Sequence, residues 1–107
     1  GDIPCTPNLS KEEIQGNYEE ETGNVIVRTF ANKNPIHVPG VLVGSHGPFS
    51  WGKDVHEAVY HAVVLEEVGK MALQTCLVNP DRGAIDPVLL DKHFLRKHGE
   101  NSYYGQK

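Results

Sequence analysis

The chain has 107 residues, with ten Lys plus Arg and fourteen Asp plus Glu, which gives a formal net charge of −4 and the size of one ordinary domain or part of one. Hydrophobic residues make up 38% and charged residues 22%, close to globular averages, so a disordered, collagen-like or coiled-coil chain is a poor starting assumption. The mild acidity, without a long basic run, favours a small-molecule or protein partner over nucleic acid or a membrane surface, and no apolar run approaches the roughly 20 residues of a membrane span.

The cysteines and the start of the chain bear on its origin. Cys5 and Cys76 match neither a C-x-x-C spacing nor a dense disulfide framework, so we expect two buried free thiols in a cytoplasmic protein. No basic and apolar leader suggests export. Because the chain begins at Gly1 without Met, we expect it to be processed or cut from something longer.

Helix signals dominate the first third of the chain. Ser10 followed by Glu13 is a capping box, which predicts a short helix that Gly16 closes. Three consecutive Glu residues and a helical spacing of apolar residues predict a second helix over 18–32.

Strand signals are concentrated in the next segment. The apolar run 40–46, bounded by Gly, predicts a buried strand, whereas 46–54 is too rich in Gly and Pro for regular structure. The segments 3–6 and 36–38 are weak strand candidates. One convincing strand cannot satisfy its own backbone hydrogen bonds, so we expect pairing strands to be missing from this chain.

Two further helices are predicted in the second half. Asp54 can cap a long helix whose apolar positions recur every three or four residues as far as Cys76. After a turn over 79–83, Asp86 and Pro87 open another helix, which Gly99 ends. The tail 100–107 has no periodicity and either frays or docks.

Two side chains could carry chemistry, and each has a simpler interpretation. His46 ends an apolar strand at a Gly-Pro-aromatic turn, where a metal ligand and a capping imidazole are equally reasonable. One His is never a complete zinc site, and no H-x-H, H-E-x-x-H or Cys cluster accompanies it. Tyr104 could act as an acid or base if it had a positive neighbour, or could simply pack.

Several motifs in chain order resemble the L-ribulose-5-phosphate 4-epimerases of the class II aldolase family. The most specific are Ser45-His46-Gly47-Pro48-Phe49 and Tyr103-Tyr104-Gly105-Gln106, and only 79–85 shows little correspondence. The resemblance implies an α/β fold, a partial α/β/α sandwich whose mostly antiparallel sheet has flanking helices. It also implies that residues 1–107 are the C-terminal part of a single domain whose other half is absent.

The resemblance implies metal-dependent epimerisation of L-ribulose 5-phosphate to D-xylulose 5-phosphate in pentose catabolism, by cleavage and re-formation of a C–C bond. A divalent metal, zinc, would act as Lewis acid. His46 would be its third ligand, Tyr104 the catalytic acid/base in a neighbouring subunit's site, and His93 a positioning or proton-handling group. The partners would be a sugar phosphate and further copies in a homotetramer. A sugar-phosphate aldolase of the same family and a non-catalytic assembly or binding module remain as alternatives.

Overall fold

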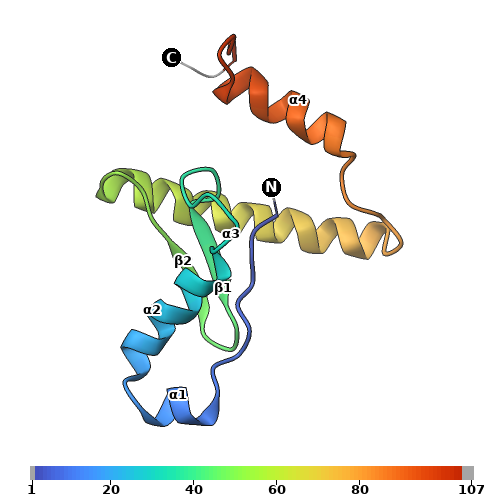
Figure 1. The fold of residues 1–107 in the computed structure, drawn as a ribbon. Helices are drawn as coiled ribbons and strands as arrows, with labels where there is room; N and C mark the ends of the chain where they lie inside the picture. The colour runs from blue at the N-terminus through green and yellow to red at the C-terminus, as the bar shows by residue number, and fades with distance from the viewer. Residues whose placement is uncertain (1, 105–107) are drawn as a thin grey trace. The chain divides into compact units, whose positions relative to one another are not determined.

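The computed structural model describes residues 2–104 (Figure 1). The chain divides into two compact units, Gly1–Gln74 and Thr75–Lys107. In chain order the elements are α1 (Lys11–Gln15), α2 (Tyr18–Thr29), β1 (Gly40–Val43), β2 (Gly47–Ser50), α3 (Val55–Val78) and α4 (Pro87–His98). The second predicted helix therefore exists but ends at Thr29, and the predicted strand ends at Val43, followed by a turn over 44–46.

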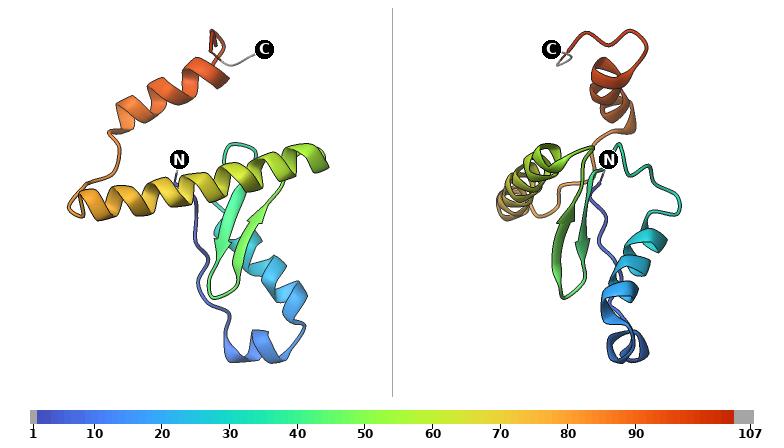
Figure 2. Two further views of the ribbon diagram at one scale, coloured as in Figure 1. Left: turned by 180° about the vertical axis from the view of Figure 1, so that it is seen from behind. Right: turned by 90° about the vertical axis from the view of Figure 1, so that its left-hand side faces the viewer.

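The first unit is built around an antiparallel hairpin, in which Gly40 pairs with Ser50 and Val43 with Gly47. Beside β1 runs the N-terminal segment, which forms a parallel bridge between Cys5 and Leu42. Of the two weak strand candidates, 3–6 therefore supplies this single bridge, whereas 36–38 lies in turns. Figure 2 shows α2 and α3 on opposite sides of the hairpin. This mixture of helices and a small antiparallel sheet is compatible with a partial sandwich, and the complete sandwich stays a prediction.

The prediction of irregular structure over 46–54 is wrong for Gly47–Ser50, which forms β2. The backbone of Leu42 hydrogen-bonds to Pro4 and Thr6 of the N-terminal segment, on the side of β1 that faces away from β2. Leu42 and Pro48, which face each other in the hairpin, therefore form a pair without mutual hydrogen bonds. The nitrogen of Pro48 therefore faces the outer edge of the sheet, where its missing N–H leaves no bond of the hairpin unmade.

Helix α3 is the expected long helix, but it buries much less of its apolar face than its periodicity predicts. Asp54 caps it through its carboxylate, which accepts from the Glu57 N–H at 2.9 Å. Ser50 and Trp51 attach it to the hairpin, because the Ser50 hydroxyl donates to the Ala58 carbonyl at 3.0 Å and the His61 Nδ1 donates to the Trp51 carbonyl at 2.7 Å. The described hydrophobic core consists of Val25, Val41, Val43 and Leu65.

The expectation of buried thiols is also wrong, since Cys5 and Cys76 are free, as expected, but exposed. Cys76 lies on the C-terminal part of α3, where the described apolar side chains Leu77 and Val78 are exposed as well. Within residues 2–104, no helix is both long and apolar enough to cross a membrane.

The second unit contains α4, which begins and ends as its sequence predicts. The Asp86 carboxylate accepts from the Val88 N–H at 2.8 Å, Pro87 occupies the first turn, and the Gly99 N–H donates to the Leu95 carbonyl at 2.7 Å. The tail then docks on its own helix, because the N–H groups of Tyr103 and Tyr104 both donate to the Arg96 carbonyl. Residues 105–107, with the end of the Y-Y-G-Q motif, lie outside the described residues.

Glu13 links α1 to α2. Its carboxylate accepts from the Ser10 N–H at 2.7 Å and from Arg28 Nη2, also at 2.7 Å, while the Ser10 hydroxyl accepts from the Glu13 N–H. The hydrogen bond from the Ser10 backbone, followed by the one from Arg28, lowers the pKa of Glu13 from its ordinary value of 4.5.

We expect Glu13→Gln to lower the free energy of unfolding at neutral pH and to have little effect in acid. A lowered folded-state pKa means that the ionised carboxylate stabilises the fold above the unfolded-state pKa, and that this contribution disappears as pH falls through the folded-state value. Urea unfolding of both proteins between neutral pH and pH values below 4.5 measures the difference. A difference that grew on acidification would contradict the assignment.

Candidate functional site

His46 lies at the end of the β1–β2 turn, and the backbone of the turn fixes its position. The His46 N–H donates to the Val43 carbonyl at 3.0 Å, which closes a four-residue turn. Of the two central residues only Ser45 has a positive φ, 57°, which is the type II pattern and favours Gly at that position. A side chain in this left-handed region costs about 1–2 kcal/mol, so Ser45 holds a strained conformation next to His46.

The turn is anchored to the N-terminal segment by side chains from far away in the sequence. The buried Thr6 hydroxyl accepts from the Gly44 N–H at 3.0 Å and donates to the Pro7 carbonyl at 2.9 Å. The Ser45 hydroxyl donates to Asn8 Oδ1 at 3.2 Å. These bonds fix the turn from which the imidazole projects.

Two aromatic rings flank the imidazole. The Phe49 ring centroid lies 5.2 Å from that of His46, tilted by 41°, and the Tyr18 centroid lies at 6.2 Å, at an interplanar angle of 24°. Tyr18 comes from α2 and Phe49 from β2, so two elements restrict the orientation of the ring. The His46 side chain is nevertheless exposed, which suits a residue that binds something outside the chain.

The described residues do not form a metal site on their own. Residues 2–104 contain no group of three or more His, Cys, Asp or Glu side chains that could hold a metal ion. A catalytic zinc takes about three protein ligands, and His46 could be one of them. The donor set present here therefore does not fit a complete metal centre, and any metal would need ligands from outside these residues.

A hollow of about 500 Å³ lies next to His46. Its polar lining side chains are those of Asn8, Tyr18, Ser45 and His46, and its apolar wall is formed by Leu9, Ile14 and Val43. Polar groups from three separate segments therefore converge on one space, which is the usual arrangement in a small-molecule site.

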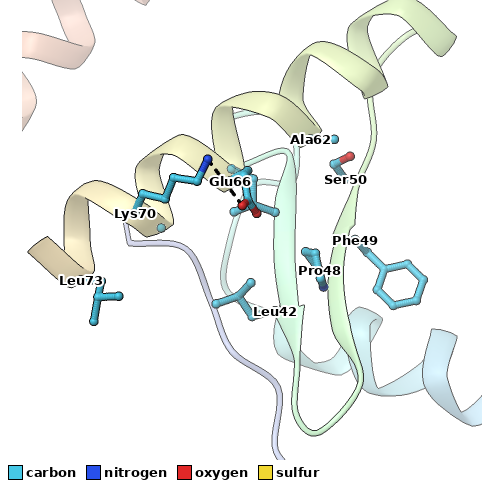
Figure 3. A pocket seen from close by; sticks show the side chains of 10 residues that line it. Leu42, Pro48, Phe49, Ser50, Ala62, Glu66, Lys70 and Leu73 are labelled. Carbon is cyan, nitrogen blue, oxygen red and sulfur yellow. Dashed lines mark ion pairs between the residues drawn. The ribbon is translucent and has the colours of Figure 1, made fainter.

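A second hollow, of about 390 Å³, lies between the hairpin and α3 (Figure 3). Its wall is mostly apolar, with Leu42, Pro48 and Leu73 among its lining residues. The ion pair between Lys70 and Glu66, 3.7 Å long, lies on the α3 side, and both side chains are more than half exposed. An exposed pair of this kind contributes little, and the lining offers no convergent polar set comparable with that around His46.

The other two predicted site residues belong to the second unit. Tyr104 is half exposed, and two cations lie over its ring, the Arg96 guanidinium at 4.5 Å and the Lys97 ammonium at 5.5 Å from the centroid. The Tyr104 ring therefore lies against two positively charged side chains of α4. His93 is exposed on α4, three residues before Arg96. His46 lies in the first unit, whereas Tyr104 and His93 lie in the second.

The supporting residues around His46 were not predicted as site residues. Thr6 and Asn8 lie 38 and 37 residues from their partners in the turn, and nothing local marks them. Ser45 carries a weak signal, because a residue between Gly44 and His46 in a tight turn is a candidate for positive φ. The cations around Tyr104 could have been found, since Arg96 and Lys97 lie in the last turn of a predicted helix.

A comparison with protein families identifies the family of the segment that contains this turn. Residues 1–73 match the family model described as the Class II Aldolase and Adducin N-terminal domain. The matched segment contains the hairpin, the His46 turn and the part of the N-terminal segment that anchors it.

Gly44 tests whether this anchoring holds the turn. A Cβ at Gly44 would lie 2.6 Å from Asn8 Oδ1 and 3.1 Å from the Thr6 carbonyl oxygen, so Gly44→Ala must displace the Asn8 side chain from its bond to Ser45 and press on the backbone at Thr6. We expect a loss of about 1–3 kcal/mol in the free energy of unfolding. The control is Gly69→Ala on α3, where nothing lies within 4 Å and where Ala should stabilise by about 0.5–1 kcal/mol. Equal midpoints for both variants in thermal unfolding would contradict the close approach.

Proposed function

Because the chain belongs to the class II aldolase and adducin family, we propose that it forms part of a metal-dependent enzyme that breaks and re-forms a C–C bond in a sugar phosphate. More specifically, we propose the 4-epimerisation of L-ribulose 5-phosphate to D-xylulose 5-phosphate. The observation that carries the proposal is an exposed imidazole on an anchored turn, His46, inside the segment that the family model matches. The family description joins aldolases with adducin, so membership alone does not assign catalysis.

His46 is proposed as one metal ligand. The support is its exposure, the two rings that restrict its orientation and the rigid turn beneath it. His46 would help to hold zinc, and the described residues do not complete the coordination of the ion. The family's class of chemistry is the reason to expect a divalent cation.

Tyr104 is proposed as the group that gives or takes the proton of the substrate's C4 hydroxyl. Its phenol can donate its proton and, as a phenolate, accept one. An acid/base residue that acts on the C4 hydroxyl must do one or the other at each step of the inversion. Arg96 and Lys97 supply positive charge beside the ring, which attracts a phosphorylated substrate. His93, on the same helix, is proposed to position the reacting carbons.

We further propose that copies of the protein associate as a homotetramer, with Tyr104 acting in the site of a neighbouring copy. The support is the exposed apolar surface of α3 in the first unit, where Val59, Val63 and Met71 are each more than half exposed. Large exposed apolar patches are typical of interaction surfaces.

His46→Asn should greatly reduce the metal content of the assembled enzyme, because removing one of about three ligands leaves the cation weakly held. Metal analysis after gel filtration measures this directly, without a turnover assay. The control is His56→Asn, which removes an exposed imidazole from α3. Unchanged zinc in the His46 variant would rule out the ligand assignment.

Tyr104→Phe should leave the metal content unchanged and lower kcat by about a hundredfold or more, the usual contribution of a general acid or base. Tyr103→Phe, at an exposed neighbouring position, should retain most turnover. Identification of the products by NMR separates the candidate activities: D-xylulose 5-phosphate indicates epimerisation, and released glycolaldehyde phosphate indicates an aldolase. If the assembled wild-type protein made neither product, the non-catalytic alternative would replace the proposal.

A further inference from the structure

The hollow beside His46 has a chemical character that narrows what it can bind. Among the described residues that line it, none is Asp, Glu, Lys or Arg. A phosphate group would find no Lys or Arg side chain among these described residues to balance its charge. The amide of Asn8 and the hydroxyls of Ser45 and Tyr18 instead suit neutral hydroxyl groups, which both donate and accept hydrogen bonds.

Ser45 is the most informative of these side chains, because its backbone conformation favours glycine. With a φ of 57° at the third position of the turn, Gly would fit without strain. The hydroxyl of Ser45 is what Gly would lack, and this hydroxyl donates to Asn8 Oδ1 at 3.2 Å. Backbone strain retained next to a candidate site is a reason to look for a functional role of the side chain.

The bond between the two side chains leaves complementary groups available on both. Since the Ser45 hydroxyl gives its hydrogen to Asn8, its oxygen lone pairs can still accept. Since Asn8 Oδ1 accepts that hydrogen, its amide nitrogen keeps two donors. A sugar hydroxyl that donates to Ser45 Oγ and accepts from Asn8 Nδ2 would satisfy both residues at once.

We propose that Asn8 and Ser45 form a hydroxyl-recognition subsite that holds the unphosphorylated part of a ketose next to His46. The inference rests on the proposed function for the identity of the sugar class. It adds two binding residues, one of them from the segment before α1, and it locates the phosphate of the substrate outside this hollow.

The test is a titration of the ¹⁵N-labelled 107-residue chain with L-ribulose and, separately, with inorganic phosphate, followed by amide chemical shifts. We expect L-ribulose to shift the signals of Asn8, Ser45 and His46, and phosphate to leave them in place. Removal of one neutral hydrogen-bonding partner should raise the Kd about three- to tenfold.

Two substitutions at one position separate the hydroxyl from the strain. Ser45→Ala keeps the strained Cβ and removes the hydroxyl, whereas Ser45→Gly removes both. We expect the two variants to differ in thermal stability, with Gly the more stable, and to weaken L-ribulose binding equally. Asn8→Ala should also weaken it, whereas Asn24→Ala, an exposed amide on α2, is the matched control and should bind like the wild type.

Three results would overturn the subsite: no L-ribulose shifts in the wild type, wild-type affinity in both Ser45 variants, or phosphate shifting the same residues as strongly. The proposed function fails by a different route, when the assembled wild-type protein makes neither D-xylulose 5-phosphate nor glycolaldehyde phosphate from L-ribulose 5-phosphate. Sugar binding that depends on Ser45 would then stand without the epimerase assignment, and the converse result would remove only the subsite.

Discussion

The contact between the N-terminal segment and β1 is the constraint on which the rest of the first unit depends. Leu42 receives a backbone hydrogen bond from Thr6 and donates one to Pro4, at 2.8 and 2.9 Å. This pairing brings the Thr6 hydroxyl to the Gly44 N–H and thereby fixes the start of the turn that ends in His46. A β-hairpin of two short strands is marginal in water, so the third segment determines whether the turn has one structure. The orientation of the candidate ligand is therefore set by residues about 40 positions away from it.

The helices were predictable because their determinants are local. Ser10, Asp54 and Asp86 accept hydrogen bonds from N–H groups two or three residues ahead, and Gly16 and Gly99 end their helices within one turn. Strand β2 was not predictable in this way. Gly and Pro normally indicate a loop, and only the alternation of hydrogen-bonded and non-bonded pairs in the hairpin places Pro48 where its missing N–H is harmless. The prediction that α3 buries its apolar face was wrong for a related reason. Periodicity identifies the apolar face of the helix but does not show whether another surface covers it.

In the candidate site, too, the residues with a local sequence signal were predictable and the others were not. His46 was identifiable from its position between an apolar run and a Gly-Pro turn, and Tyr104 from its motif. Thr6 and Asn8 have no local signature, since their contribution arises only when the N-terminal segment pairs with β1. The roles of His46, His93 and Tyr104 stay predictions: the family match reaches residue 73 and so includes the first of them but neither of the other two.

The hydrophobic core and the candidate metal site are both incomplete within the described residues. Four described hydrophobic residues are buried, and Leu65 is the one that α3 contributes, whereas Val55, Val59, Val63 and Met71 on the same helix are each more than half exposed. Among residues 2–104, His46 is the candidate metal ligand, and the groups of three that a catalytic zinc site requires are absent from this part of the chain. Association along α3 would remove this apolar surface from water, which contributes roughly 25 cal/mol for each Å² buried. Ser50 and Trp51 attach the same helix to the first unit beside the hairpin. A partner that covered α3 would therefore stabilise the unit that carries His46, because the helix it covers is hydrogen-bonded to the segment that continues that hairpin.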